Sequence, residues 1–176
     1  MALTKSQFLK LVQKQIANTS VGASTLRGMA PGTGRATTDC LEQLDLRVFS
    51  TNASSFRRAL DRETDRLVKR LPKGRWGAAR KFLNIFLRGA TYNRFVCEAY
   101  NLHRAEPWLE VPLDSNVAKK LLGGEGGRAV LPPWRGIKWL DPEMSRQYQD
   151  FAAQVAKKEG INRVHLDLLY WRSSQR

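Results

Sequence analysis

The sequence predicts an all-α fold, and two observations lead to that prediction. Apolar residues recur at intervals of three and four in several separate stretches, which is the spacing of one buried helix face. These stretches begin beside residues that cap helices, and several of them stop at glycine or proline. The 176 residues, of which 42% are hydrophobic, suffice for a single compact helical domain, or for two small lobes that share a core and leave a cleft between them.

The N-terminal part is predicted to contain a helix, a loop and a second helix. Thr4 and Gln7 have the spacing of a capping box, and residues 4–17 carry apolar side chains at helical intervals. Residues 18–38 are rich in glycine, serine and threonine, which predicts an irregular loop before a helix over about 37–49. Long loops are commonly either disordered or functional, so both interpretations of this one stay open.

Two long helices are predicted in the middle of the chain. The first follows Ser54-Ser55, which can cap it, and has an inward apolar stripe at Phe56, Ala59, Leu60, Leu67 and Val68. It ends at the turn 71–74. The second spans about 78–100, either as one helix or as two that break near Gly89, with core positions at Phe82, Ile85, Phe86 and Leu87.

A short helix is predicted after Pro112, which holds the approach extended. Asp114 or Ser115 can cap it, and Gly123-Gly124 can stop it. An acidic side chain is therefore expected at a helix entrance.

The last third is predicted to hold an irregular segment and two helices. Glycines and the pair Pro132-Pro133 exclude regular structure over 123–139. Asp141-Pro142 is a strong helix start, and Gly160 is the corresponding stop. Residues 163–171 fit helix or strand by pattern, and we predict a helix because the rest of the chain is helical.

The net charge indicates the kind of partner. Thirty Lys and Arg against sixteen Asp and Glu give +14 and a pI near 10.4. A folded domain this basic most often binds a polyanion, because neutralising phosphates releases condensed counterions. Nucleic acid is the leading candidate, ahead of an anionic membrane surface.

A phosphate-binding turn is predicted between the two long helices. The turn around Leu71-Pro72-Lys73-Gly74 is rich in glycine, lysine and arginine. A helix, a glycine turn and a second helix present free backbone N–H groups together with cations, which suits a phosphate.

These features resemble the helix-hairpin-helix superfamily of DNA glycosylases, the relatives of endonuclease III. The hairpin of that family reads like L-P-G-V-G-R-K-T-A-N, and the stretch 77–84 matches it at Gly77, Arg80, Lys81 and Asn84. The family's catalytic loop reads like V-D-T-H-V, and the stretch 112–117 matches it at Asp114 and Val117, with Ser115 in place of threonine. The interval from Lys81 to Asp114 is longer than in endonuclease III. The resemblance implies a helix-hairpin-helix motif followed by a catalytic-aspartate loop.

The resemblance also implies a reaction, the removal of a damaged or modified base that has been flipped out of double-stranded DNA. Base removal builds positive charge on the sugar, so the carboxylate of Asp114 would stabilise the transition state and orient a water. Lys81 would attack the sugar and permit strand cleavage. Each residue also has a simpler interpretation, Asp114 as an ordinary helix cap and Lys81 as a phosphate contact or a solvated lysine. We expect a monofunctional glycosylase somewhat more than a glycosylase-lyase.

Further residues are expected to contact the DNA. Phosphate contacts are predicted for Lys73, Gly74, Arg75, Gly77, Arg80 and Lys119. Base stacking is predicted for Trp76, Trp134 and Trp139, although the last two can equally cap the core. The glycine-rich stretch 20–34 either lies against DNA, or lines the base pocket, or is a surface loop.

No cofactor or metal is expected. Two cysteines are too few for the four-thiolate iron–sulfur cluster of some endonuclease III relatives, and His165 and Asp167 are a poor metal signal, so a structural histidine is favoured. No apolar run approaches the roughly 20 residues of a membrane span, and no signal peptide is evident. We expect a cytoplasmic monomer.

Two functions remain open. The first is a DNA glycosylase, and the divergent small form suggests the antiviral branch that attacks hypermodified cytosine in phage DNA. The second is a basic helical module that binds DNA or RNA without catalysis. Substitution of Asp114 discriminates between them.

Overall fold

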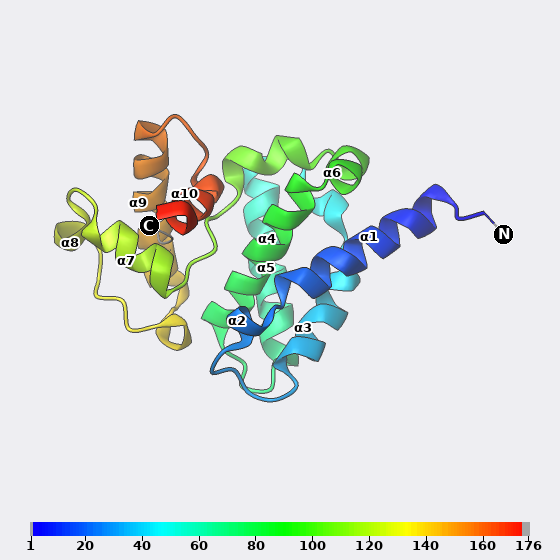
Figure 1. Ribbon diagram of the computed structural model, residues 1–176, viewed down its shortest axis with the longest axis horizontal. Coiled ribbons are helices and arrows are strands. Elements are labelled where there is room, and N and C mark those ends of the chain that lie inside the picture. The colour runs from blue at the N-terminus through cyan, green and yellow to red at the C-terminus, as the bar shows by residue number, and fades with distance from the viewer. Residues whose placement is uncertain (1, 174–176) are drawn as a thin grey trace.

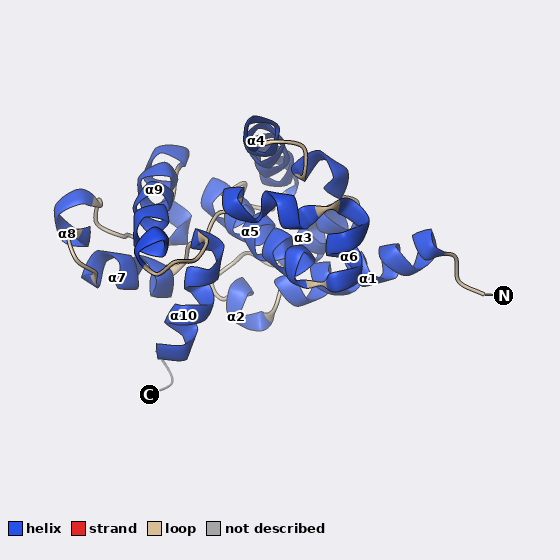
Figure 2. Ribbon diagram, turned by 90° about the horizontal axis from the view of Figure 1, so that it is seen from above, coloured by secondary structure: helices blue, strands red, loops and turns tan. Residues whose placement is uncertain are grey.

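The structure is a computed structural model that describes residues 2–173, and all regular elements within that range are helical (Figures 1 and 2). This confirms the all-α prediction. Ten α-helices are defined in the described range: α1 Lys5–Ser20, α2 Ala23–Leu26, α3 Thr33–Glu42, α4 Ala53–Arg70, α5 Trp76–Tyr92, α6 Arg94–Tyr100, α7 Ser115–Gly123, α8 Gly127–Val130, α9 Pro142–Lys158 and α10 Leu166–Ser173. Four 3₁₀-helices connect them: η1 Leu46–Phe49, η2 Leu102–Trp108, η3 Ile137–Trp139 and η4 Arg163–His165.

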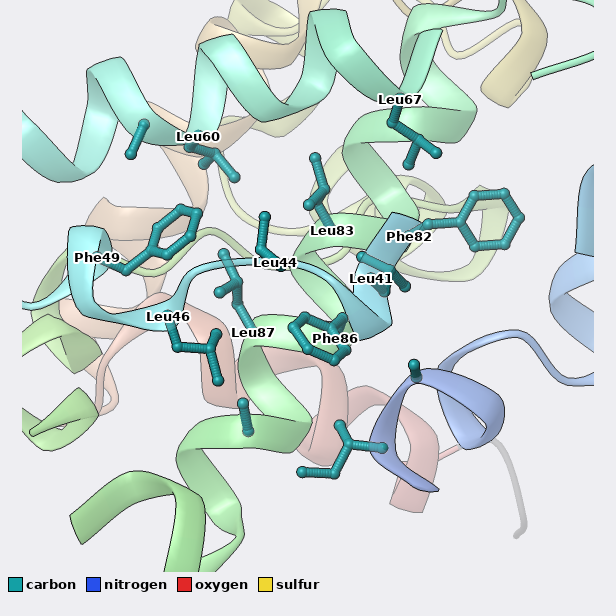
Figure 3. Close-up of a cluster of buried hydrophobic side chains, with 14 of the residues drawn as sticks. Leu41, Leu44, Leu46, Phe49, Leu60, Leu67, Phe82, Leu83, Phe86 and Leu87 are labelled. Carbon is teal, nitrogen blue, oxygen red and sulfur yellow. The ribbon is translucent and has the colours of Figure 1, made fainter. Parts of the chain in front are cut away.

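The buried apolar side chains form two clusters, and each defines a lobe. Helices α1–α6 make the N-terminal lobe, in which α5 lies centrally and packs against both α4 and α1. Its largest fully buried side chains include Phe49, Phe82 and Phe86 (Figure 3). Helices α7–α10 make the C-terminal lobe, whose core surrounds the fully buried Tyr148 of α9.

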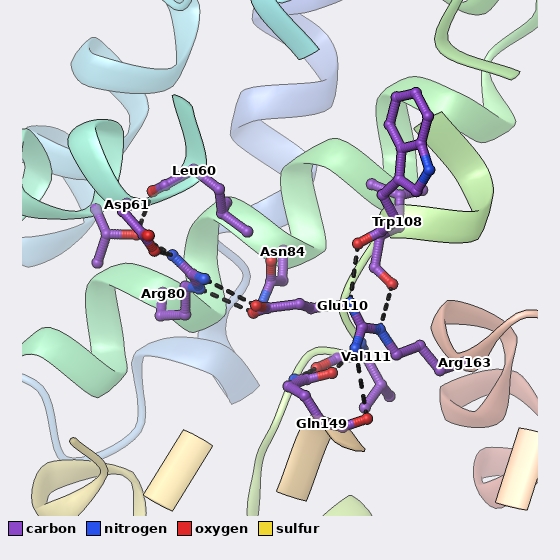
Figure 4. Close-up of polar contacts among 11 residues, drawn as sticks. Leu60, Asp61, Arg80, Asn84, Trp108, Glu110, Val111, Gln149 and Arg163 are labelled. Atoms are coloured by element: carbon purple, nitrogen blue, oxygen red, sulfur yellow. Dashed lines mark hydrogen bonds and ion pairs between the residues drawn. The ribbon is translucent and has the colours of Figure 1, made fainter. Parts of the chain in front are cut away.

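The connection between the lobes, residues 108–111, is fixed by hydrogen bonds from the C-terminal lobe (Figure 4). Arg163 donates from Nη2 to the Trp108 carbonyl at 3.0 Å and from Nε to the Leu109 carbonyl at 2.8 Å. The Gln149 amide pairs with the backbone of Val111, accepting from N–H at 3.0 Å and donating to the carbonyl at 2.8 Å. The geometry of the segment that leads to Asp114 is therefore set by the C-terminal lobe.

The predicted caps are confirmed where the signal is local. Thr4 forms a complete capping box with Gln7. Asp114 caps α7, which ends at Gly123, and Asp141 caps α9 with Pro142 in the first turn. Gly160, which follows α9, has φ of +68°, as expected for a glycine helix stop. The C-terminal segment is helical from Arg163 to Ser173, and the predicted stretch 163–171 lies within it.

Several predicted boundaries are wrong. The loop over 18–38 is shorter than expected, because α1 continues to Ser20 and α3 already begins at Thr33. The predicted helix 37–49 is two elements, since α3 ends at Glu42 and a separate 3₁₀-turn follows. Asn52, and not Ser54 or Ser55, caps α4, because its side chain accepts from the Ser55 N–H at 2.9 Å.

Corrections are also needed around α5 and in the glycine-rich segment. Helix α5 begins at Trp76, earlier than predicted, and runs through Gly89 to Tyr92. The break comes at Asn93, whose side chain caps α6 by accepting from the Val96 N–H. Residues 123–139, predicted to lack regular structure, contain the short elements α8 and η3.

Candidate functional site

The two predicted catalytic residues lie next to each other. Asp114 Oδ1 accepts from the backbone N–H groups of Asn116 and Val117 at 2.9 and 3.0 Å, so this oxygen serves the cap of α7. Asp114 Oδ2 is directed to α5, where Lys81 Nζ lies 3.8 Å away. One oxygen is thus used structurally, and the other faces an amine.

Lys81 lies in a partly dry environment. Its side chain is 12% exposed, whereas that of Asp114 is 37% exposed. Burial lowers the pKa of Lys81, and the charge of Asp114 and its hydrogen bond only partly oppose this effect. A lysine with a lowered pKa supplies more neutral amine near neutral pH than a solvated one, which is what an amine nucleophile requires.

Further polar pairs join α5 to the C-terminal lobe beyond Lys81. Arg88 forms an ion pair with Asp167 of α10. One turn further, Tyr92 Oη and His165 Nδ1 are hydrogen-bonded at 2.7 Å. The other ring nitrogen of His165 contacts Glu106 Oε1 at 2.8 Å. These interactions give His165 a structural role, and no group of metal-ligating residues is found in the described part of the chain.

A cavity of about 370 Å³ lies beside the Lys81–Asp114 pair. It is enclosed by the segment 27–33, the turn 71–75, the start of α7 and the segment 136–138. Ala78, one turn before Lys81 on α5, lines it, and so does Ser115, which follows Asp114. The cavity is thus built from segments that are distant in the sequence, and it is lined by neighbours of Lys81 and Asp114 but not by the two residues themselves.

The walls of this cavity are electropositive. Four cationic residues line it, namely Arg27, Lys73, Arg75 and Lys138, and the lining contains no Asp or Glu. The N-terminal ends of α3, α5 and α7 meet here, and neither α3 nor α5 has a side-chain hydrogen bond at its cap. Free backbone N–H groups and helix dipoles add positive potential to that of the side chains. The arrangement suits an anion of phosphate type.

The structure divides the predicted phosphate contacts into three groups. Lys73, Gly74 and Arg75 line the cavity, and Gly74 has φ of +45°, which favours glycine in the turn. Lys119 is exposed on α7 but does not line the cavity. Gly77 and Arg80 are both buried and do not line the cavity.

Arg80 is a structural residue and not a phosphate contact. It is only 6% exposed. Its guanidinium donates to both carboxylate oxygens of Glu110 at 2.8 Å, to Asp61 Oδ1 at 2.8 Å and to Thr64 Oγ1 at 3.1 Å. Four of its N–H groups are thereby satisfied within the protein, which leaves little capacity for an external anion.

Gly77 serves the packing of α5 and not the approach of a phosphate. It lies inside the first turn of α5, and a Cβ atom there would come within 2.3 Å of the Ile137 carbonyl oxygen and 2.7 Å of Leu140 Cβ. Residues 77–81 are thus helical, and the turn between α4 and α5 consists of residues 71–75.

The three predicted stacking residues lie in different environments. Trp139 is 60% exposed, and the ammonium of Lys138 lies 5.5 Å from its ring centroid. Trp134 packs edge-on against Tyr148, and its Nε1 donates to Ser115 Oγ at 3.1 Å. Trp76 lies under the guanidinium of Arg80 and lines a different cavity. Trp139 alone among the three combines exposure with a place next to a cationic cavity residue.

No protein-family model matches the chain, and neither a curated protein nor a solved structure matches it. None of the described helices has the length and apolar character that crossing a membrane requires.

Arg27 was not singled out as a site residue, although it lies in the stretch 20–34, for which contact with DNA or a place in the base pocket was one open prediction. Its neighbour Gly28 has φ of +74°, and the segment 27–30 turns back toward the 71–75 turn to close the cavity. The Arg27-Gly28 pair, in a predicted loop whose other cation is Arg35, was the available signal. Lys138 stood beside Trp139 in the sequence, but nothing local indicated that the Lys138 carbonyl would accept a hydrogen bond from Arg75.

Proposed function

We propose that this protein is a DNA glycosylase that removes a flipped, damaged or modified base by cleaving its N-glycosidic bond. The observation that carries the proposal is the placement of Asp114 Oδ2 3.8 Å from Lys81 Nζ, beside a cavity with four cationic residues in its lining. A carboxylate, an amine of lowered pKa and an anion site are the groups that such a reaction needs.

The cationic cavity is the proposed site for the DNA backbone. A phosphate flanking the target nucleotide would lie against the 71–75 turn, between the cations of that turn and those of the 27–33 and 136–138 segments. Helix N-termini and cations bind phosphate oxygens without reading sequence. This contact would hold the flipped nucleotide close to Asp114.

Asp114 is the proposed transition-state stabiliser. As the bond between C1′ and the base breaks, its electron pair leaves with the base nitrogen, and positive charge develops on the sugar. Oδ2, which is not used in the helix cap, would stabilise that charge and accept a proton from the attacking water. The water oxygen then bonds to C1′ and leaves an abasic site.

Lys81 supports a second version of the reaction. Its amine would attack C1′ as the bond to the base breaks and its electron pair leaves with the base, and the new ammonium would transfer a proton to Asp114. The C1′–O4′ bond then opens, O4′ takes the proton back from Asp114, and the resulting imine permits strand cleavage. Burial lowers the pKa of Lys81, which favours this version, whereas the contact with Asp114 favours the charged, unreactive ammonium. We place the monofunctional reaction first.

The substrate is proposed to be a modified cytosine in phage DNA. The protein would be incubated with genomes that carry ordinary and hypermodified cytosines, and the released bases identified by mass spectrometry. Release from a modified genome, absent with Asp114→Asn, is the expected result. Absence of any released base, with intact DNA binding, would refute the glycosylase.

A binding module without catalysis is the second candidate. Both oxygens of Asp114 already have partners in the protein, the α7 cap and Lys81, which is sufficient reason for an aspartate at this position. In that case the cavity binds phosphates of DNA or RNA, and substitution of Asp114 by Asn leaves function unchanged.

A further inference from the structure

A second cavity, of about 570 Å³, lies between the lobes and shares no lining residue with the cationic cavity beside Asp114. It is bounded by the first turns of α4, by residues 107–110 and by the C-terminal end of α9 with the segment 160–163. Its volume falls within the range of roughly 300–1,000 Å³ that is usual for small-molecule sites. Nothing in the proposed glycosylase reaction uses it.

One side of this cavity is aromatic. Phe56 of α4 and Trp108 of η2 line it with ring centroids 6.2 Å apart and planes at 57°. Pro107 and Ile161 add apolar surface. Phe56 is 3% exposed and forms the floor, while Trp108 is half-buried and offers part of its ring. A flat heterocycle fits such a wall, because aromatic rings stack on one another and exclude water.

Cations line the other side. Arg57 and Lys157 are exposed, and among the described residues neither side chain has a hydrogen bond or an acidic ion-pair partner. Arg163 is largely buried, and burial lowers its pKa. Attraction to Glu110 and Asp150 opposes this effect, whereas repulsion from Arg57 adds to it. Two cations that repel each other across a cavity gain free energy when an anion lies between them.

Glu110 is the acidic residue in the lining, and its charge is already compensated. Both of its carboxylate oxygens accept from Arg80, and one also accepts from Asn84. Burial raises the pKa of Glu110, but these partners outweigh it and leave the pKa below its ordinary value. The carboxylate of Glu110 is therefore occupied by Arg80 and Asn84 and does not cancel the charge of Arg57 and Lys157. The N-terminal end of α4 also faces the cavity through Ala53.

We propose that this cavity is a nucleotide-binding site, with the base against Trp108 and the phosphate between Arg57 and Lys157. Arg163 adds positive charge to this site without a direct contact, because its Nε, Nη1 and Nη2 groups already donate to the Leu109, Gln149 and Trp108 carbonyls. An aromatic wall beside a cationic one, in a cavity of this size, matches a base linked to a phosphate. The same chemistry is offered by a free mononucleotide and by the terminal nucleotide of a single strand. The assignment is independent of the proposed glycosylase reaction, because it uses neither Lys81 nor Asp114.

The test is a titration followed by tryptophan fluorescence and calorimetry. The probes are deoxyadenosine monophosphate, inorganic phosphate, and a short single-stranded oligonucleotide with a 5′ phosphate. We expect saturable binding of the mononucleotide, weaker binding of inorganic phosphate, and a fluorescence change that is lost in Trp108→Phe. Arg57→Ala and Lys157→Ala should each weaken binding about tenfold, the equivalent of one charge-assisted contact.

Arg58→Ala is the matched control. Arg58 is the next residue of α4, is equally exposed, and bonds to Ser54 and Ser55 instead of lining the cavity. The affinity of the Arg58→Ala variant for the mononucleotide should equal that of the unaltered protein. Asp114→Asn should also bind normally, so loss of base release and loss of this site are distinguishable.

Comparison of the probes identifies the source of the nucleotide. Affinity that is at least tenfold higher for the oligonucleotide, with the same dependence on Trp108, assigns the site to a strand end. Equal affinities assign it to a free nucleotide. The proposal is overturned if no probe binds saturably at millimolar concentration. It is also overturned if Arg57→Ala and Lys157→Ala both leave the affinity unchanged in proteins with unchanged circular dichroism.

Discussion

Arg80 donates through Nε and Nη2 to the two carboxylate oxygens of Glu110, both at 2.8 Å, and so joins α5 to the segment that leads into Asp114 (Figure 4). Consecutive residues of a helix point about 100° apart. When Arg80 is held against Glu110, the next side chain, Lys81, is directed about 100° around α5, where it meets Asp114. The structural pair thus positions the candidate catalytic pair.

Removal of the Glu110 carboxylate should strongly destabilise the fold. Glu110→Ala leaves the buried Arg80 guanidinium without its main partner, and uncompensated buried charges cost about 3–5 kcal/mol. Urea unfolding measures the change. Asp61→Asn is the comparison, because the Asp61 side chain is 57% exposed and contributes little. Equal effects of the two substitutions would contradict the assigned role of Glu110.

Substitution of Asp114 by Asn and by Ala separates catalysis from capping. Asparagine caps helices as well as aspartate does, so Asp114→Asn should retain the stability of α7 and lose base release. Asp114→Ala should lose base release and, in addition, about 1 kcal/mol of stability. Thermal unfolding and base-release assays of both variants are the measurements. Base release by Asp114→Asn at the unaltered rate would show that the residue is only a cap.

Borohydride trapping tests Lys81 and its pH dependence. If Lys81 is the nucleophile, reaction with a modified duplex in borohydride should give a covalent adduct that Lys81→Ala cannot form. Burial lowers the pKa of Lys81, so the neutral amine, and with it the trapping rate, should increase as the pH rises toward that pKa, below the ordinary value of 10.5.

The lowered pKa of Lys81 also makes the stability of the folded protein depend on pH. Between the folded-state pKa of Lys81 and 10.5, the unfolded chain binds more protons than the folded one, so this residue's contribution to stability should rise with pH in that window. Lys81→Met should remove the contribution.

The trapping experiment has two further outcomes. An adduct that persists in Lys81→Ala would direct the search to Lys73, Lys119 or the amino terminus, and abasic sites without any adduct would establish the monofunctional reaction.

The cations of the cavity should determine the salt dependence of DNA binding. Lys73→Ala, Arg75→Ala and Lys138→Ala should each weaken duplex binding and lower the slope of log K against log salt by about 1. Lys10→Ala on α1 removes an equal charge away from the cavity and should leave the slope nearly unchanged. Affinity that does not vary with salt in the unaltered protein would refute nucleic acid as the partner.

Gly77→Ala should destabilise the protein by about 1–3 kcal/mol, because its Cβ would overlap the Ile137 carbonyl and force η3 away from α5. Gly123→Ala is the control, since a Cβ there meets no atom within 4 Å. Urea unfolding compares the two. If Gly77 instead admitted a phosphate, the substitution would reduce DNA affinity while stability stayed unchanged.

The sequence by itself determined the helical character of the chain and the features that depend on residues two to four positions apart. Thr4, Asp114 and Asp141 cap helices as predicted because each accepts hydrogen bonds from backbone N–H groups in its own first turn. Gly160 ends α9 for an equally local reason, since it adopts positive φ after the last turn.

Tertiary structure decided which side of each helix serves which purpose. Arg80 and Lys81 are adjacent cations in the sequence, and only the packing of α5 against Glu110 on one side and Asp114 on the other gives one a structural role and the other a place at the candidate site. The cationic cavity depends on the same level of structure. Its walls come from three helix N-termini and the 136–138 segment, and their meeting depends on how two separate cores pack together and not on any local pattern.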